Sequence, residues 1–318
     1  MIKKIITTLS IFVLLVSLGA CAATTTTKTT SSNNSDKSVT AAGETKYPFT
    51  IKDSYGRSII IEKAPKTIIS VAPNVTETVF ALEAQKELIG RTDYCNYPED
   101  AKNIQSIGGL DSPNMEKIAE LKPDLVIASV MLTKEADAKL ASLNIKVVVL
   151  SDNTSLKDVY ANIINIGKIV NANNKAATLV QDMKKKVSEV TAKVKGKTKP
   201  SVYYVVSYGK AGNWTAGSGT FINDLIQMAG GTNAASDVVS FKDYSMEKLI
   251  EKDPNIIICP KYYDTKKGIL ATDGYKDLTA IKKDKLFEID NNMIDIMGPR
   301  VADGLEAMAK IIHPEAFK

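Results

Sequence analysis

Short apolar runs alternate with amphipathic segments along most of the chain. Seven runs rich in Ile, Val, Leu and Tyr have the length of buried strands, at 67–72, 88–92, 124–129, 145–150, 201–206, 255–259 and 285–289. Helical spacing follows two of them, at 75–82 and at 220–228, where Gly230 and Gly231 mark the end of the second helix. Strands that alternate with helices predict mostly parallel sheets, so we expect an α/β fold with two similar halves.

An internal repeat supports two halves. Asn114-Met-Glu-Lys-Ile precedes Pro123-Asp-Leu-Val-Ile, and Ser245-Met-Glu-Lys-Leu precedes Pro254-Asn-Ile-Ile-Ile at the same spacing. Each copy offers a polar helix cap, an acidic residue in the first turn, a proline turn and a buried strand. Because helix–proline–strand units are common, a chance match stays open, but the repeat predicts one equivalent unit in each half.

A longer amphipathic stretch lies between the halves. Its apolar side chains recur every three or four residues, at Leu179, Met183, Val187, Val190 and Val194. We expect a single helix here, capped by Asn173 or Asn174, which would form a stiff connection. The expected organisation is an N-terminal α/β domain, a bridging helix and a C-terminal α/β domain, over residues 47–173, 174–197 and 198–318.

The amino end has the pattern of an export signal. Lys3 and Lys4 precede a short apolar run, which is too short to span a bilayer, and small residues lead to Cys21. Leu18-Gly19-Ala20-Cys21 resembles the bacterial lipobox, so Cys21 is expected to be lipidated after cleavage of residues 1–21. Residues 22–46, rich in Thr, Ser, Asn and Lys, predict a flexible tether.

Composition excludes several function classes. The net charge is +5, with basic and acidic residues interspersed, which does not favour nucleic-acid binding. Besides Cys21 only Cys95 and Cys259 are present, too few for a disulfide framework, and we expect free thiols. His313 is the single histidine, so a zinc site or a His-based hydrolase is hard to assemble.

Several segments together resemble one protein family. The chain is similar to the cobalamin- and iron-siderophore-binding proteins of ABC importers, and within them it leans toward the cobalamin-binding branch. The resemblance covers nearly all of residues 47–318. It is carried by Ile69-Ser-Val-Ala-Pro-Asn, Gly90-Arg-Thr-Asp-Tyr-Cys-Asn-Tyr-Pro, the two repeat units, Thr215-Ala-Gly-Ser-Gly-Thr-Phe-Ile and Gly298-Pro-Arg-Val-Ala-Asp-Gly-Leu. It implies two Rossmann-like lobes joined by one long α-helix, with a ligand cleft between the lobes.

The implied cleft lies at the carboxyl ends of the strands, as in other open α/β sheets. The loops there offer the expected ligand-binding residues Asn74, Tyr94, Tyr97, Leu110, Tyr208, Trp214, Phe241, Tyr244, Asn292 and Asp295. Flat, rigid aromatic side chains suit a large planar ligand. Arg300 is expected to anchor its loop. The resemblance implies no catalytic residue, no metal-binding residue of the protein itself and no resident cofactor.

This chain departs from the cobalamin binder it resembles at four of these loop positions. Leu110 and Ser129 stand where that binder has further aromatics, and Asn292 and Ile296 replace an acidic residue and an arginine. Asp295 partly compensates for the lost acidic residue. The departures leave cobalamin, another corrinoid, haem and an iron chelate open as the ligand.

The resemblance also implies how the protein meets its partners. Glu116 and Glu247 occupy equivalent repeat positions, and in the family such glutamates contact arginines of the two permease subunits. The alternative is a helix-dipole role worth only about 0.3–1 kcal/mol. We therefore expect a lipid-anchored, extracytoplasmic monomer that serves an ABC permease dimer and its ATPase subunits.

Three alternative functions are less consistent with the sequence. Thr215-Ala-Gly-Ser-Gly-Thr before a helix is compatible with anion binding by an enzyme of the same architecture, but it lacks the Gly-Lys-Ser/Thr of a nucleotide loop. A binder of free metal ions would need clusters of His and carboxylates. A purely structural surface protein would need no cleft. We expect a binding protein and not an enzyme.

Overall fold

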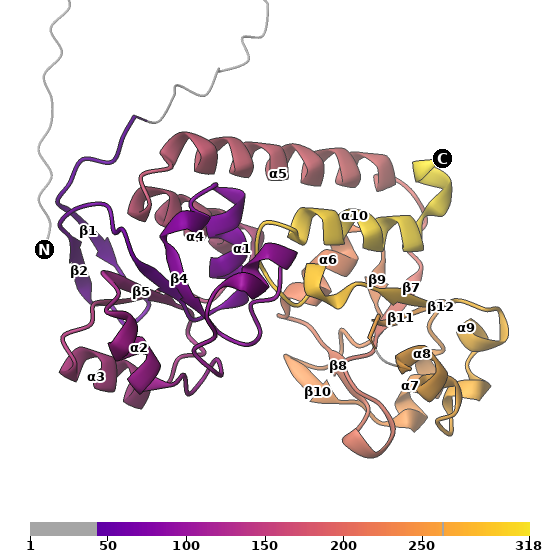
Figure 1. Ribbon diagram of the computed structural model, residues 1–318. Helices are drawn as coiled ribbons and strands as arrows, with labels where there is room; N and C mark the ends of the chain where they lie inside the picture. The colour runs from indigo at the N-terminus through magenta and orange to yellow at the C-terminus, as the bar shows by residue number, and fades with distance from the viewer. Residues whose placement is uncertain (1–42, 263) are drawn as a thin grey trace, which may run out of the picture. The chain divides into compact units, whose positions relative to one another are not determined.

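Two four-stranded parallel sheets account for the apolar runs (Figure 1). The structure, a computed structural model, describes residues 43–262 and 264–318. The first sheet contains β3 (Ile68–Ser70), β4 (Leu88–Arg91), β5 (Leu125–Ala128) and β6 (Val147–Val149). The second contains β7 (Ser201–Tyr204), β9 (Thr232–Asn233), β11 (Ile256–Pro260) and β12 (Leu286–Ile289). Their strand orders are β4-β3-β5-β6 and β12-β11-β7-β9, so the expected α/β fold is confirmed.

Helices connect these strands. They are α1 (Pro73–Ala81), α2 (Met115–Leu121), α3 (Lys134–Ser142), α4 (Leu156–Ile169), α5 (Asn173–Val194), α6 (Phe221–Met228), α7 (Met246–Lys252), α8 (Thr265–Leu270), α9 (Thr279–Lys282) and α10 (Val301–Ile312). Short 3₁₀ turns lie at Gln85–Glu87, Glu99–Asn103, Gly209–Ala211, Tyr275–Asp277, Asn291–Met293 and Pro314–Phe317. Two antiparallel pairs complete the fold, β1 (Phe49–Lys52) with β2 (Ser58–Ile61) and β8 (Trp214–Ala216) with β10 (Phe241–Asp243).

The expected repeat is confirmed. Asn114 accepts a hydrogen bond from the backbone N–H of Lys117 at the start of α2, and Ser245 does the same for Lys248 at the start of α7. Both helices end on a left-handed residue, after which the chain enters β5 in one half and β11 in the other. The same local chemistry therefore builds the same unit twice.

The bridging helix is present as α5, 22 residues long, and it packs against α4 and α10 (Figure 1). Its start differs from expectation, because Ala172 is the N-cap and no side chain caps the helix. Asn173 lies inside the first turn, and its amide donates to the Gly43 carbonyl (2.7 Å) and to Thr45 Oγ1 (3.0 Å). That side chain binds the preceding segment and is not available as a cap.

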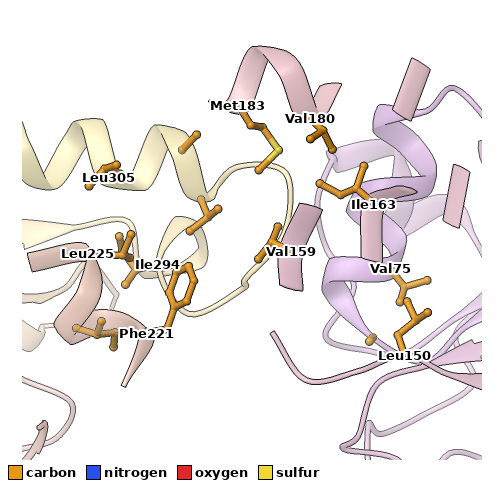
Figure 2. Packing of buried hydrophobic residues seen from close by; sticks show 14 of the residues in the cluster. Val75, Leu150, Val159, Ile163, Val180, Met183, Phe221, Leu225, Ile294 and Leu305 are labelled. Atoms are coloured by element: carbon orange, nitrogen blue, oxygen red, sulfur yellow. The ribbon is translucent and has the colours of Figure 1, made fainter. Parts of the chain in front are cut away.

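The core is layered around the sheets. One apolar cluster lies on the outer face of each sheet, with Ile118 and Leu140 in the first and Leu249 and Ile269 in the second. A third cluster continues from one half to the other beneath α5. Figure 2 shows Ile163, Val180, Met183 and Leu305 in this shared cluster. The helix α5 is thus packed against both halves, although the domain boundaries at 173 and 198 stay predictions.

The expected leader 1–21, with Cys21, and residues 22–42 of the expected tether lie outside the described residues. Residues 43–46, expected to end the tether, are tied to the end of α4. Thr45 N–H donates to Asn171 Oδ1 at 2.7 Å, and its hydroxyl donates to the Lys168 carbonyl at 2.9 Å. Within residues 43–262 and 264–318, no helix is long and apolar enough to cross a membrane.

Candidate functional site

Two adjoining cavities lie where both sheets end. One has a volume of about 580 Å³ and the other about 410 Å³, within the range of small-molecule sites. Both are lined by Asp152, Asn153, Asn291, Asp295 and Met297. We call the two cavities together the cleft.

The cleft is built from strand ends of both halves. From the N-terminal half come residues just after β3, β5 and β6, including Asn74, Ser129 and Asp152. From the C-terminal half come Tyr204 at the end of β7 and Pro260 at the end of β11. Carboxyl ends of parallel strands share one edge of a sheet, which brings residues distant in sequence to one site.

Six of the ten expected ligand-binding residues line the cleft. Asn74, Tyr94, Leu110 and Asn292 line the 410 Å³ cavity, Phe241 lines the 580 Å³ cavity, and Asp295 lines both. Tyr94 and Phe241 are 59% and 47% exposed, so their ring faces are open to a ligand. Exposed rings beside a cavity are typical of ligand-binding surfaces.

The other four expected residues lie outside the cavity linings. Tyr244 is only 1% exposed, packs in the core, and donates from its hydroxyl to Asp237 Oδ1 at 3.0 Å. Tyr208 packs under α8, where a Cβ on Gly268 would meet its hydroxyl. Trp214 is exposed on β8 beside Gly212. Tyr97 stacks on Arg300. For Tyr244 this corrects the expectation, because burial leaves its ring no free face.

Other cleft residues were missed from the sequence. They include Asp152, Asn153, Tyr204 and Tyr262. Asp152 and Asn153 directly follow the apolar run at 145–150, and Tyr204 ends the run at 201–206. The strand-end rule that selected Asn74 would have selected them as well.

The phenol of Tyr204 and the carboxyl group of Asp295 both line the 580 Å³ cavity. Asn291 Nδ2 donates to Asp295 Oδ2 at 3.2 Å. Desolvation in the cleft raises the pKa of Asp295 above its usual range, while the hydrogen bond from Asn291 lowers it again in part. Burial also raises the pKa of Tyr204, and the charge of Asp295 adds to that rise. Among the described residues the buried Tyr204 hydroxyl has no partner within ordinary hydrogen-bond length.

An asparagine pair holds the two sides of the cleft together. Asn153 Nδ2 donates to the Met297 carbonyl at 2.6 Å, linking the loop after β6 to the loop after β12. Asn162 on α4 donates to Asn153 Oδ1 at 2.6 Å and to the Ser151 carbonyl at 2.8 Å. The amide of Asn153 is therefore fixed from behind.

An ion pair also crosses from one half to the other. Arg300 Nε and Nη2 donate to the two carboxylate oxygens of Glu77 at 2.9 and 2.6 Å, and the guanidinium lies 3.7 Å from the centre of the Tyr97 ring. Burial raises the pKa of Glu77, and Arg300 counteracts the rise. Arg300 thus anchors its loop, as expected, and it does so on α1 of the opposite half.

Glu116 and Glu247 lie at the first turns of α2 and α7, both exposed. Among the described residues neither carboxylate takes part in an ion pair. Each half therefore presents an unpaired carboxylate in the first turn of the repeated helix.

Cys95 and Cys259 are buried free thiols. In residues 43–262 and 264–318 no group of three or more His, Cys, Asp or Glu side chains is arranged to hold a metal ion.

Comparison with known proteins gives one consistent picture. An uncharacterised ABC transporter substrate-binding lipoprotein, YvrC of Bacillus subtilis, is 31% identical over 86% of this chain and 88% of its own. A cobalamin-binding protein of Halobacterium salinarum is 25% identical over 84% of this chain and 74% of its own. The structure of a possible iron-binding, periplasmic solute-binding protein from Staphylococcus epidermidis superimposes with a TM-score of 0.70 at 28% identity. That superposition covers 79% of this chain and all of the other.

Residues 68–293 match the model of the periplasmic binding protein family. The names of these three relatives all describe binding proteins. With both sheets and the cleft within or next to the matched region, the chain belongs to the periplasmic binding protein family.

Proposed function

We propose that this protein is the extracytoplasmic solute-binding component of an ABC importer. We propose further that it binds a metal chelate, with a corrinoid as the leading candidate, and that it does not change the ligand chemically. One observation carries the proposal. A single cleft at the strand ends of both halves exposes aromatic and thioether side chains beside polar loop groups. Such a surface holds ligand faces by apolar contact and fixes orientation by hydrogen bonds.

The cobalamin-binding relative supports a corrinoid, and the structural neighbour described as possibly iron-binding supports an iron chelate. Iron-siderophore or haem binding is the alternative. The cleft offers no His–acid pair among its lining residues, which does not favour an enzyme. Lipidation of Cys21 would hold the protein at the membrane surface, where it would serve a permease dimer with its ATPase subunits.

Calorimetric titration of the purified protein with cobalamin, cobinamide, haemin and ferric siderophores tests the proposal. We expect saturable 1:1 binding of at least one chelate. Phe241→Ala should weaken that binding about tenfold, because the ring contributes an exposed face to the 580 Å³ cavity. Ile250→Ala removes an exposed apolar side chain outside the cleft and should leave affinity unchanged. If no chelate in the panel binds, the proposed function is wrong.

The docking role of the repeat is tested separately. Replacing both Glu116 and Glu247 by Gln should leave ligand affinity unchanged and lower uptake at least tenfold, since two carboxylates that meet permease arginines would be lost. Glu120 and Glu251 lie one turn further along the same helices and are also exposed. The double variant Glu120→Gln with Glu251→Gln should therefore transport normally. Normal uptake by the Glu116 and Glu247 variant would contradict the docking proposal.

A further inference from the structure

The charged side chains of the cleft all have one sign. Among the described residues that line either cavity there is no Lys, Arg or His. Two carboxyl groups are present, on Asp152 and Asp295, and each lines both cavities. A ligand in the cleft therefore meets acidic groups from both halves and no cationic side chain.

The strongest positive groups nearby do not offset these carboxyl groups. Arg300 lies on the same loop as Asp295, but its guanidinium is paired with both oxygens of Glu77. The first residues of α1 and α6 line the cleft, and a helix start is equivalent to about half a positive charge. α1 begins with Pro73, which has no N–H, and the side chain of Thr220 already binds the N–H of Asn223 in α6. The positive charge of the two helix starts is therefore smaller than the negative charge of two carboxylates.

The hydrogen-bonding groups lead to the same conclusion. Asp152, Asp295 and Asn291 present oxygen atoms that accept hydrogen bonds. The Asn153 amide nitrogen is already engaged by the Met297 carbonyl. A ligand whose edge carries amide N–H groups, or a positive charge, finds acceptors here. A ligand whose edge carries carboxylates meets like charge at Asp152 and Asp295.

We propose that Asp152 and Asp295 are specificity-determining residues, which make the cleft select neutral or cationic, amide-bearing chelates over chelates that carry carboxylates. This inference rests on the proposed function, because it concerns the same site. It separates ligand classes that the family resemblance leaves open. Corrinoids with a carboxamide periphery and cationic hydroxamate chelates match the charge of the cleft, whereas haem, with its two propionates, does not.

The test uses pairs of related ligands that differ in charge, measured by calorimetry on the full-length protein at pH 7.5. The first pair is cyanocobalamin and its monocarboxylic acid, in which one side-chain amide has been hydrolysed. The second is ferrioxamine B and its anionic N-succinyl derivative. Haemin is titrated as well. We expect each neutral or cationic member to bind about tenfold or more tightly than its carboxylate partner, the size of effect that one like-charge pair gives in a protein cleft.

Variants then locate the effect. Asp295→Asn and Asp152→Asn should each reduce the preference for the uncharged or cationic member severalfold, since the amide keeps the shape and removes the charge. Asp182→Asn makes the same change of net charge on the exposed face of α5, away from the cleft, and should leave the preference intact. Circular dichroism melting confirms that each variant is folded.

The outcomes separate this inference from the proposed function. If no chelate binds, the proposed function fails and the inference fails with it. If a carboxylate derivative binds as tightly as its uncharged or cationic partner, the protein is a chelate binder and the proposed charge selectivity is wrong. The same holds if haemin binds as tightly as cyanocobalamin or ferrioxamine B. An equal shift for Asp182→Asn would assign the preference to overall charge and would also overturn the inference.

Discussion

Replacing Arg300 by Met is expected to lower the free energy of unfolding by about 3–5 kcal/mol, the usual result of removing one partner of a buried ion pair. The side chains of Arg300 and Glu77 are only 13% and 2% exposed. Without the guanidinium, Glu77 keeps a carboxylate in a site that water hardly reaches, and Tyr97 loses the cation stacked on its ring. Urea denaturation followed by circular dichroism measures the change.

Two further variants distinguish a buried ion pair from ordinary packing. Lys186 pairs with Asp303 at the surface, where both side chains are about half exposed, so Lys186→Met should cost less than about 1 kcal/mol. In the double variant Glu77→Gln with Arg300→Met no unpaired charge remains, and part of the lost stability should return. A cost for Arg300→Met no larger than that for Lys186→Met would contradict the buried character of the pair.

This ion pair also shows how the cleft keeps its shape. Arg300 is attached to α1 of the opposite half, and Met297, on the same loop, receives the hydrogen bond of Asn153. Gly298 lies between them, where an added Cβ would already touch Asn74. Residues 297–300 are therefore bound to the N-terminal half at Met297 and at Arg300, and Gly298 passes close to it between them. The relative position of the two cleft walls follows from these contacts as well as from α5.

The parts of this fold that could be predicted from the sequence depend on local chemistry. The repeat was recognisable because Asn114 and Ser245 are helix caps whose roles depend on residues three positions away. The strand ends were recognisable because buried parallel strands are continuous apolar runs. That rule placed Asn74 and Asp295 in the cleft, and it also reaches Asp152, which had not been selected.

Contacts between residues distant in sequence could not be predicted in this way. Glu77 and Arg300 are 223 positions apart, and the sequence around either residue does not indicate that the two side chains meet. The residues that flank Tyr244 in the sequence are polar, as in a loop. In the structure, however, its hydroxyl donates to Asp237 and its ring packs in the core. The β1–β2 hairpin was also missed, although its alternating residues and the left-handed Gly56 are a recognisable pattern.

Gly217→Ala is expected to destabilise the protein by about 3 kcal/mol and to weaken ligand binding, because the space for a side chain is closed by backbone. A Cβ there would lie 2.3 Å from the Val238 carbonyl oxygen and 2.9 Å from that of Ser240. Both carbonyls are held in place by hydrogen bonds from Gly217 and Ser218. Relief requires the 238–240 segment to move, and that segment leads directly into Phe241 on the cleft wall.

Gly219→Ala provides the matched control. Gly219 has open space around its Cβ position but a φ of +76°, so an alanine there meets only backbone strain of about 1–2 kcal/mol. Urea denaturation of both variants separates steric conflict from strain. Ligand affinity is compared between Gly217→Ala and the unaltered protein, because Gly219 itself lines the 580 Å³ cavity. If Gly217→Ala costs no more than Gly219→Ala and leaves affinity unchanged, the 238–240 segment yields easily. Phe241 would then owe its position in the cleft to other contacts than the close approach of these two backbone segments.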